Sequence, residues 1–199
     1  FILSGSWCTF AAKKHKPNIL YCYSPPRGFY DLYEDVKKKI PFILKPLFII
    51  YAKSIRWAIE KNLKFIGRIS TVSTNSRNRI RNYWKKESAV IYPPTDTSLY
   101  RYKKNGNFWL SVNRLYPPKR IDLQIEVFRR IPEENLLIAG GNAKGDNSQA
   151  YVDKIKKRLP QNVKLMGSIS TKELQKLYSD CKGLIATAKD EDFGMNVVE

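Results

Sequence analysis

The residues best suited to ligand binding or catalysis lie at the end of the chain, in positions 190–199. Three acids, an aromatic residue and a glycine follow a short apolar run at 183–187, in the order Asp190-Glu191-Asp192-Phe193-Gly194. The apolar run is typical of a buried parallel strand, and the residues from Met195 onward are apolar enough to open a helix. Unpaired backbone N–H groups at such a corner can bind a phosphate or a sugar edge, and Gly194 permits close approach.

Two carboxylates in this stretch have a spacing that suits the binding of hydroxyl groups. Glu191 and Glu199 are separated by seven residues, about two helical turns, so both can border one cleft if a helix begins near Gly194. A solvated loop followed by a helix start explains the same residues, because acids complement the dipole at a helix N-terminus. Taken alone, these residues favour the second interpretation at least as much as the first.

A basic motif earlier in the chain offers a second set of binding groups. Asn113 and Arg114 end one apolar run, and Lys119 and Arg120 stand where the next helix is expected to begin. The planar guanidinium of Arg114, which can bind two oxygens at once, and the compact ammonium of Lys119 can together hold a diphosphate. Solvated cations are common in so basic a protein, but cations are unfavourable at a helix N-terminus, so this position calls for an anion.

Two adjacent glycines, Gly140 and Gly141, follow the next apolar run and permit tight turns near a ligand, although such a pair is a weak signal. The chain contains neither a G-x-G-x-x-G pattern nor a P-loop. The sequence therefore argues against a dinucleotide-dependent dehydrogenase and against a Walker-type ATPase.

The elements that must position these residues alternate between strand and helix in the second half of the chain. Apolar runs predict strands at 108–113, 136–139, 163–166 and 183–187. Helices are expected at 119–130, at 150–159 after a polar loop, and at 171–181, the last capped by Thr171. This rhythm indicates a parallel sheet covered on both faces, with ligands at the carboxyl ends of its strands.

The first half shows the same alternation. Strands are expected at 1–4, 18–23, 68–73 and 89–92, and a helix capped by Asn75-Ser76 is expected to run to about 84. The rigid loop 24–28 is suited to presenting Arg27 at the end of a sheet. Pro93-Pro94-Thr95-Asp96 is a stiff connector after which the alternation starts afresh, so the predicted domains are 1–95 and 96–199.

A long helical region at 31–61, broken near 41–46 by prolines, allows two interpretations. The favoured one is a core helix with a solvated basic face. The alternative is a helix on a membrane surface, because its residues are of the types found at a lipid interface, namely Phe42, Leu44, Leu47, Phe48 and Trp57 with nearby lysines.

Charge and composition limit the class of protein. The chain has 199 residues and a net charge of +18, of which residues 1–95 carry +13 and residues 96–199 carry +5. Such a field favours polyanions or an anionic membrane surface. The three cysteines are too few and too scattered for a disulfide framework or a zinc site, which indicates a reducing cytoplasm. The chain starts without Met and stops inside a helix signal, so a fragment of a longer protein is expected.

Several motifs, in order, resemble the nucleotide-sugar half of a family 4 glycosyltransferase, with the Arg/Lys pair and the Glu-x7-Glu pattern as its marks. They are Ser111 to Leu115 with Lys119-Arg120, Leu137 to Gly141, Asn162 to Ser168, Leu174 to Cys181, and Glu191 to Gly194 ending on Glu199. The first half is similar to the O-antigen mannosyltransferase branch through Tyr21 to Arg27, Asn75-Ser76 and Ile91 to Asp96. The likeness covers nearly the whole chain.

The resemblance implies an α/β enzyme of GT-B type, with two Rossmann-like domains on parallel sheets, both incomplete in this fragment. It implies a retaining transferase that moves a hexose, with mannose favoured, from a GDP- or UDP-sugar to a glycan or lipid-linked acceptor. No cofactor and no metal are expected. The enzyme would be cytoplasmic, with peripheral contact with the inner face of the plasma membrane as a further expectation.

The resemblance also implies roles for individual residues. Arg114 and Lys119 would neutralise the donor diphosphate and stabilise the leaving group, and Glu191 would hold the sugar with the backbone of Phe193-Gly194. Glu199 would bind the ribose hydroxyls. The other donor-binding residues would be Asn113, Gly140, Gly141, Asp192 and Met195.

The first domain departs from the pattern of the resembled branch. Tyr23 stands where a histidine is expected, a second histidine expected near Trp7 is missing, and His15 lies in a basic linker where it is expected to be exposed. Tyr23 and Arg27 remain candidates for that domain's side of a cleft. Two other interpretations stay open, a basic nucleic-acid-binding α/β module and a non-catalytic sugar-binding relative. No RNP-like or KH-like signature is present, so nucleic acid is not the expected partner.

Overall fold

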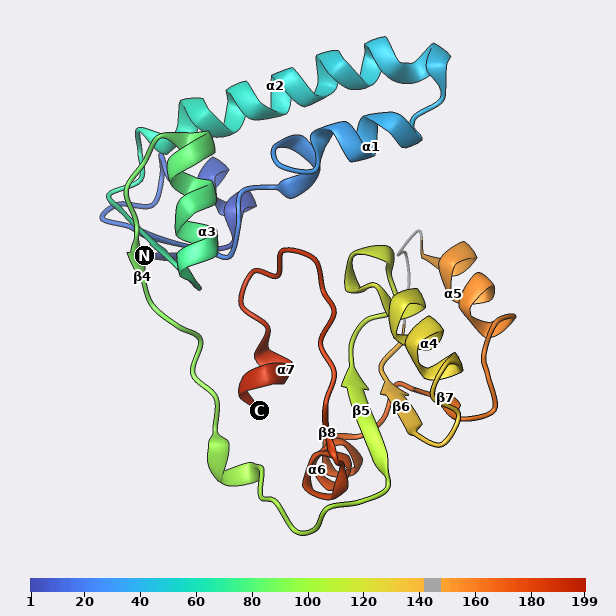
Figure 1. The fold of residues 1–199 in the computed structure, drawn as a ribbon. Helices are drawn as coiled ribbons and strands as arrows, with labels where there is room; N and C mark the ends of the chain where they lie inside the picture. Colours follow the sequence, from blue (N-terminus) through green and yellow to red (C-terminus); the bar gives the residue numbers. More distant parts are fainter. Residues whose placement is uncertain (142–147) are drawn as a thin grey trace. The chain divides into compact units, whose positions relative to one another are not determined.

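The computed structural model describes residues 1–141 and 148–199. The chain forms two compact units, Phe1–Pro93 and Pro94–Glu199, and a parallel sheet lies at the centre of each (Figure 1). The polar loop expected after Gly141 falls at 142–147, outside the described residues. Both units have the predicted α/β organisation, because parallel strands need long crossover connections, which helices provide in each unit.

The sheet of the first unit keeps its strands in chain order. Its strands are β1 (Ile2–Ser4), β2 (Ile19–Cys22), β3 (Arg68–Thr71) and β4 (Ala89–Val90), all parallel, in the order β1-β2-β3-β4. A 3-10 helix at Ser6–Ala11 precedes the basic linker. His15 in that linker is partly buried, not exposed as expected, because its Nδ1 lies 2.8 Å from the Ala11 carbonyl oxygen.

The helices of the first unit follow the proline pattern. Helix α1 (Tyr33–Lys39) ends before Pro41, a 3-10 turn (Phe42–Leu44) follows, and α2 (Lys45–Leu63) accepts Pro46 in its first turn, where no intrahelical N–H bond is lost. Helix α3 (Thr74–Arg79) continues into a π-helical turn at Ile80–Trp84.

The cap of α3 lies earlier than predicted. Ser73 is the N-cap, and its Oγ accepts a hydrogen bond of 3.1 Å from the Ser76 backbone N–H. The expectation that Asn75-Ser76 caps this helix is therefore wrong, because the strand ends at Thr71 and the helix starts sooner.

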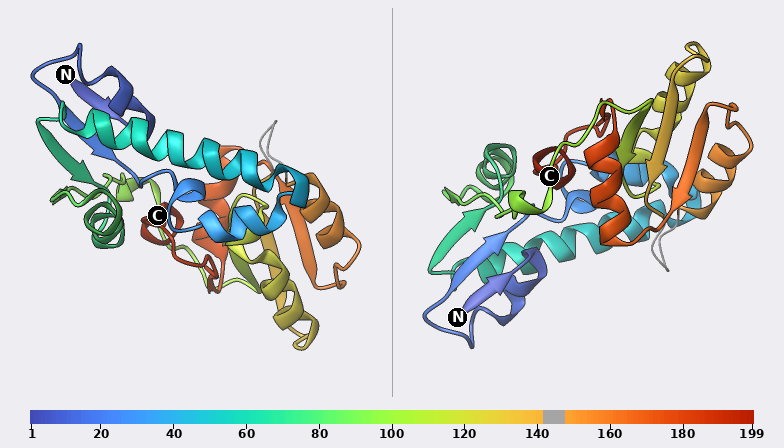
Figure 2. Two further views of the ribbon diagram at one scale, coloured as in Figure 1. Left: turned by 90° about the horizontal axis from the view of Figure 1, so that it is seen from above. Right: turned by 90° about the horizontal axis from the view of Figure 1, so that it is seen from below.

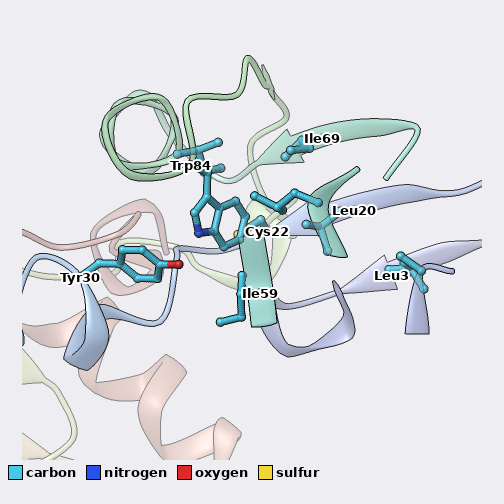
Figure 3. Packing of buried hydrophobic residues seen from close by; sticks show 10 residues of the cluster. Leu3, Leu20, Cys22, Tyr30, Ile59, Ile69 and Trp84 are labelled. Carbon is cyan, nitrogen blue, oxygen red and sulfur yellow. The ribbon is translucent and has the colours of Figure 1, made fainter. Parts of the chain in front are cut away.

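The core of the first unit joins the sheet to α2 and to the turn after α3. Leu20, Ile59 and Ile80 are fully buried, and Figure 3 shows the ring of Trp84 beside Cys22 and Ile59 in the same cluster. Residues from β2, α2 and the turn after α3 thus meet in one cluster, which is what holds short parallel strands together.

Helix α2 contacts this core with one face only. Its buried residues are Ala52, Ile59 and Leu63. The core-helix interpretation accounts for these residues but not for the exposed apolar side chains of α2 and of the 3-10 turn before it, among them Phe42, Leu44, Leu47 and Trp57. Among the described residues, no helix combines the length and the apolar character needed to cross a membrane.

The sheet of the second unit changes direction in its strand order. Its strands are β5 (Phe108–Val112), β6 (Asn135–Ala139), β7 (Val163–Gly167) and β8 (Gly183–Leu184), all parallel, in the order β7-β6-β5-β8. The chain moves outward from β5 to β7 and then crosses back to place β8 on the other side of β5. The order reverses between β5 and β8, which is the topological switch point of a Rossmann-like sheet.

The helices of the second unit are α4 (Ile121–Arg129), α5 (Gln149–Lys156), α6 (Thr171–Asp180) and α7 (Met195–Val198). Apolar residues of α4 and α5 pack with the strands in one cluster that includes Ile125, Leu136 and Ile155. Ser170 caps α6 through a capping box with Glu173, so the expectation that Thr171 is the cap is wrong by one residue.

Candidate functional site

The candidate site lies where β5 and β8 end, at the switch point of the second sheet. Open α/β sheets bind ligands in the crevice at this point, because the connections from the two neighbouring strands leave toward opposite faces. The segment after β5 contains Asn113, Arg114 and Lys119, and the segment after β8 contains Glu191. Both groups predicted from the sequence therefore follow the two strands that flank this point.

The structure brings Lys119 and Glu191 into direct contact. The Lys119 ammonium donates a hydrogen bond to Glu191 Oε2 and forms an ion pair with it. The lysine side chain is 14% exposed and the glutamate side chain 36% exposed, so the pair faces solvent mainly on its carboxylate side. A cation and a carboxylate 72 positions apart thus share one small volume.

Backbone contacts hold the two segments together around this pair. The Lys189 N–H donates to the Pro118 carbonyl oxygen at 3.0 Å, and the Thr187 hydroxyl donates to the Lys119 carbonyl oxygen at 2.9 Å. Lys119 itself belongs to a 3-10 turn, Pro117–Lys119, whose last N–H bonds the Tyr116 carbonyl at 3.0 Å. The ion pair therefore rests on a backbone framework and does not depend on two flexible side chains alone.

Two residues of this framework, Gln124 and Thr187, were not predicted from the sequence. Gln124 is buried on α4, and its Nε2 donates to Thr187 Oγ1 at 2.8 Å. The chain of contacts runs from α4 through Thr187 to the carbonyl of Lys119. The available signal was a glutamine on the apolar face of α4, between Ile121 and Ile125, because a buried amide needs a specific partner.

Arg114 and Asn113 begin the segment after β5 and differ in burial. Arg114 is exposed, with its guanidinium carbon 5.2 Å from the centre of the Tyr116 ring, and among the described residues it has no acidic partner. Asn113 is buried, and its Nδ2 donates to Ser111 Oγ at 3.0 Å while its backbone N–H bonds the Ala139 carbonyl at 3.0 Å. Arg114 is thus available to an incoming anion, and Asn113 fixes the strand end.

Gly140 and Gly141 lie at the end of β6 and are explained by close packing of the chain. Gly140 has a φ of +125°, and a Cβ there would lie 2.1 Å from the Asn113 carbonyl oxygen. A Cβ on Gly141 would lie 2.9 Å from Ser168 Oγ. The glycines let three strand ends meet at one edge of the sheet, beside the segment that carries Arg114.

The acidic loop after β8 turns into α7 through residues with left-handed backbone. Asp190 has a φ of +58°, and Gly194 is the N-cap of α7 with a φ of +83°. Asn196 on α7 donates from Nδ2 to the Val112 carbonyl oxygen at 3.0 Å, which ties this helix to the end of β5. Asp192 and Phe193 are partly buried in this loop, and Met195 is exposed with its Sδ 4.0 Å from Thr95 Oγ1.

Glu199 lies at the end of α7 in a tyrosine-rich environment. The Tyr178 hydroxyl oxygen lies 3.0 Å from Glu199 Oε2 and 3.0 Å from the Asn196 carbonyl oxygen, and Tyr100 packs edge-on against Tyr178. Burial, followed by the hydrogen bond to the Glu199 carboxylate, raises the pKa of Tyr178. Tyr178 therefore remains a proton donor at neutral pH and orients this carboxylate. Neither tyrosine was predicted from the sequence as a site residue.

Tyr23 and Arg27 belong to the first unit, in the loop after β2. The Tyr23 hydroxyl lies 3.0 Å from Ser4 Oγ, and its side chain is exposed. Arg27 forms an ion pair of 2.8 Å with Asp31, which also lies 3.5 Å from the buried Arg79. Arg27 thus supports its own loop through Asp31. Within the part of the chain that the structure describes, no three His, Cys, Asp or Glu side chains are grouped so that they could hold a metal ion.

Solved structures similar to this chain share its fold. A sucrose-phosphate synthase from Thermosynechococcus elongatus is 14% identical, matches 98% of this chain and 52% of its own, and has a TM-score of 0.72. HepE from Anabaena, solved in complex with UDP and glucose, is 13% identical over 94% of this chain and 74% of its own, with a TM-score of 0.56. These structures confirm the predicted α/β fold of GT-B type with two Rossmann-like sheets.

Sequence comparisons give the family. An uncharacterized glycosyltransferase of Methanocaldococcus jannaschii, MJ1178, is 26% identical over 132 residues, which are 66% of this chain and 36% of the relative. The chain therefore spans about a third of the length of this curated relative. The family described as "Glycosyl transferases group 1" matches residues 99–199, which include every candidate residue of the second unit. Because that match covers just over half of the chain, the protein belongs to the glycosyl transferases group 1 family.

Proposed function

We propose that the protein is a retaining glycosyltransferase that moves a hexose, with mannose favoured, from a nucleotide-diphosphate sugar to a glycan or lipid-linked acceptor. The observation that carries this proposal is the contact between Lys119 and Glu191 at the switch point. One group suits a diphosphate and the other suits sugar hydroxyls. Membership of the family supports the transfer reaction, and the UDP and glucose bound to Anabaena HepE support a nucleotide-sugar donor.

The two cations act on the diphosphate. Without a donor, the Lys119 ammonium is neutralised by Glu191. When a donor binds, its diphosphate replaces the carboxylate as the partner of Lys119 and also meets the exposed guanidinium of Arg114, which can bind two oxygens at once. Negative charge grows on the diphosphate as its bond to the sugar breaks, so fixed cations stabilise the transition state more than the bound donor.

The two glutamates bind the uncharged parts of the donor, which are the sugar and the ribose. Glu191, released from Lys119, turns to the sugar hydroxyls together with the backbone of the loop that ends at Gly194. Glu199, oriented by Tyr178, accepts hydrogen bonds from the ribose hydroxyls. Asp192, Phe193 and Met195 line the same corner, and Asn113, Gly140 and Gly141 keep the strand ends close enough for a nucleotide to lie across them.

The proposed reaction uses neither a metal nor an organic cofactor. Arg114 and Lys119 supply the positive charge that the leaving diphosphate needs. We also propose a cytoplasmic location, since Cys8, Cys22 and Cys181 are free thiols, as expected in a reducing compartment. Tyr23 and Arg27 are proposed to serve the acceptor side through the first unit.

Turnover with defined substrates tests the proposal. The full-length protein is incubated with a panel of GDP- and UDP-hexoses and a lipid-linked acceptor, and release of nucleoside diphosphate is measured. NMR of the product gives the anomeric configuration. The proposal predicts release from one nucleotide class with the donor's configuration kept. Binding of the sugar without release would identify a non-catalytic relative, and an inverted product would contradict retention.

A further inference from the structure

A ridge of large apolar side chains is exposed on the first unit. It consists of Phe42, Ile43, Leu47, Ile50 and Trp57, which are 84%, 87%, 66%, 66% and 63% exposed. The ridge begins in the 3-10 turn before α2 and follows that helix for three turns. Single exposed apolar residues are ordinary, but a group of this size along one helix marks an interaction surface.

The spacing of the ridge puts it on one face of α2. Leu47, Ile50 and Trp57 are three and seven residues apart, so they follow one side of a helix with 3.6 residues per turn. The core residues Ala52, Ile59 and Leu63 lie on the opposite side. Helix α2 is therefore apolar on two faces, only one of which is covered, whereas an ordinary surface helix has a polar outer face.

The sheet of the first unit does not shield the ridge. Figures 1 and 2 show that α1 and the N-terminal half of α2 extend side by side beyond the strands of this unit. Contacts between the two helices support this arrangement, since Tyr33 of α1 stacks on Phe48 of α2 with ring centres 5.6 Å apart. The ridge thus lies on a projection that is formed by α1 and α2.

Positive charge surrounds the ridge. Residues 37–64 contain eight Lys or Arg and one acid, Glu60. The Lys61 ammonium lies 4.5 Å from the centre of the Trp57 ring, and the Lys45 ammonium lies 5.9 Å from that of Phe42. Lysines beside exposed aromatic rings can bury their stems against apolar groups while their charge reaches a polar layer.

We propose that this ridge docks on the surface of an anionic lipid bilayer, with its apolar side chains at the acyl boundary and its lysines at the headgroup phosphates. An amphipathic surface with aromatic residues and a strong basic excess fits a bilayer interface. A second copy of the chain would bring two strongly basic segments together. The core of a protein interface is depleted in lysine, which disfavours a protein partner.

The inference rests on the first unit alone and does not require the proposed function to be correct. If the proposed function is correct, the docking surface also indicates where the acceptor is found, because an enzyme that docks on a bilayer meets acceptors carried by lipid. The docking proposal and the proposed function can be contradicted independently, since vesicle binding is measured without any sugar donor.

Cosedimentation of the full-length protein with vesicles tests the docking surface. The vesicles contain phosphatidylcholine with increasing proportions of phosphatidylglycerol. The triple variant Phe42→Ser/Ile43→Ser/Leu47→Ser is expected to lower the partition coefficient at least about tenfold, because three apolar side chains no longer enter the interface. The matched control Leu123→Ser/Val127→Ser, which removes exposed apolar residues from α4, should partition as the wild type does. Circular dichroism verifies that both variants are folded.

Variants that remove lysine charges separate attraction to the lipid headgroups from insertion of the apolar side chains. Lys38→Gln/Lys39→Gln/Lys53→Gln should weaken the dependence on phosphatidylglycerol, whereas Lys154→Gln/Lys156→Gln/Lys157→Gln on the second unit should not. Absence of binding at every lipid composition would overturn the proposal. Binding that survives the ridge substitutions would also overturn it, as would a wild-type dimer that the ridge variant dissociates.

Discussion

At the scale of single residues, the contact between Lys119 and Glu191 joins two motifs that the sequence places 72 positions apart. The residue types and their positions at strand ends were enough to predict that cations and acids meet at one edge of the sheet. The supports of the pair were not predictable in the same way. Gln124 and Thr187 act through a hydrogen bond between a helix and a loop, and only the packing of α4 shows that the two side chains meet.

Replacing Lys119 by Ala tests its role in stabilising developing charge. Turnover is expected to fall about a hundredfold, because loss of one preorganised charge donor in an active site has an effect of this order. Unfolding by urea should change by only about 1 kcal/mol, since Glu191 keeps access to water. Lys156→Ala, an exposed lysine on α5, is the control for both measurements. An equal loss of turnover and stability would assign Lys119 a structural role.

Tyr178 gives a prediction that depends on pH. Burial and the Glu199 carboxylate raise its pKa above the ordinary value of 10. The folded state therefore keeps the phenol proton at pH values where the unfolded chain has lost it. The contribution of Tyr178 to the free energy of unfolding is fully present below pH 10 and declines as the pH rises above 10.

The Tyr178→Phe variant isolates that contribution. Its free energy of unfolding is expected to be about 1 to 2 kcal/mol lower than that of the wild type at pH 7, because the hydrogen bond to Glu199 is lost. The difference should stay constant up to about pH 9.5 and shrink above pH 10. Urea denaturation across this range measures it. A difference that grows with pH above 10 would contradict the assignment.

At the scale of elements, hydrophobic periodicity predicted the strands and helices of both units because each element has one face or a whole run to bury. Helix caps were misplaced by one to three residues, since Ser, Thr and Asn are all acceptable caps and the strand before each helix decides which is used. The apolar residues on two sides of α2 allowed both a core helix and a membrane-surface helix, for a related reason. Periodicity shows which residues share a face but not whether anything covers it.

Gly140→Ala tests the close packing at the strand ends. The added Cβ would lie 2.1 Å from the Asn113 carbonyl oxygen at a φ of +125°, so the loss of unfolding free energy is expected to be about 2 to 4 kcal/mol. Gly28→Ala is the control, because its Cβ would meet only a side-chain atom at 3.6 Å. Its effect should be within about 1 kcal/mol. Equal effects of the two substitutions would argue against the strained geometry at Gly140.

Ser170→Ala tests the corrected cap of α6. Loss of the capping box is expected to lower the free energy of unfolding by about 1 kcal/mol. Thr171→Ala, at the position that the sequence pattern favoured, should have a much smaller effect because Thr171 is the first residue inside the helix. Thermal unfolding of the two variants is the measurement. A larger effect at Thr171 would restore the original prediction.

At the scale of the whole molecule, charge and chemistry are divided between the units. The second unit carries the predicted donor motifs and the match to the family, and the first carries most of the positive charge, +13 in residues 1–95. The fold class followed from the alternation of strands and helices. The strand order did not, and it is the reversal between β5 and β8 that brings the basic and acidic motifs to the same crevice.

Calorimetric titration of the full-length protein with UDP and with GDP tests this arrangement most directly. Saturable binding in the micromolar range is expected for one nucleotide, and Arg114→Ala should weaken it at least about tenfold through loss of a charge-assisted contact. Arg130→Ala, an exposed arginine at the end of α4, should bind as the wild type does. Binding that Arg114→Ala leaves unchanged, or that extends to any polyanion and falls steeply with salt, would contradict a diphosphate site at the switch point.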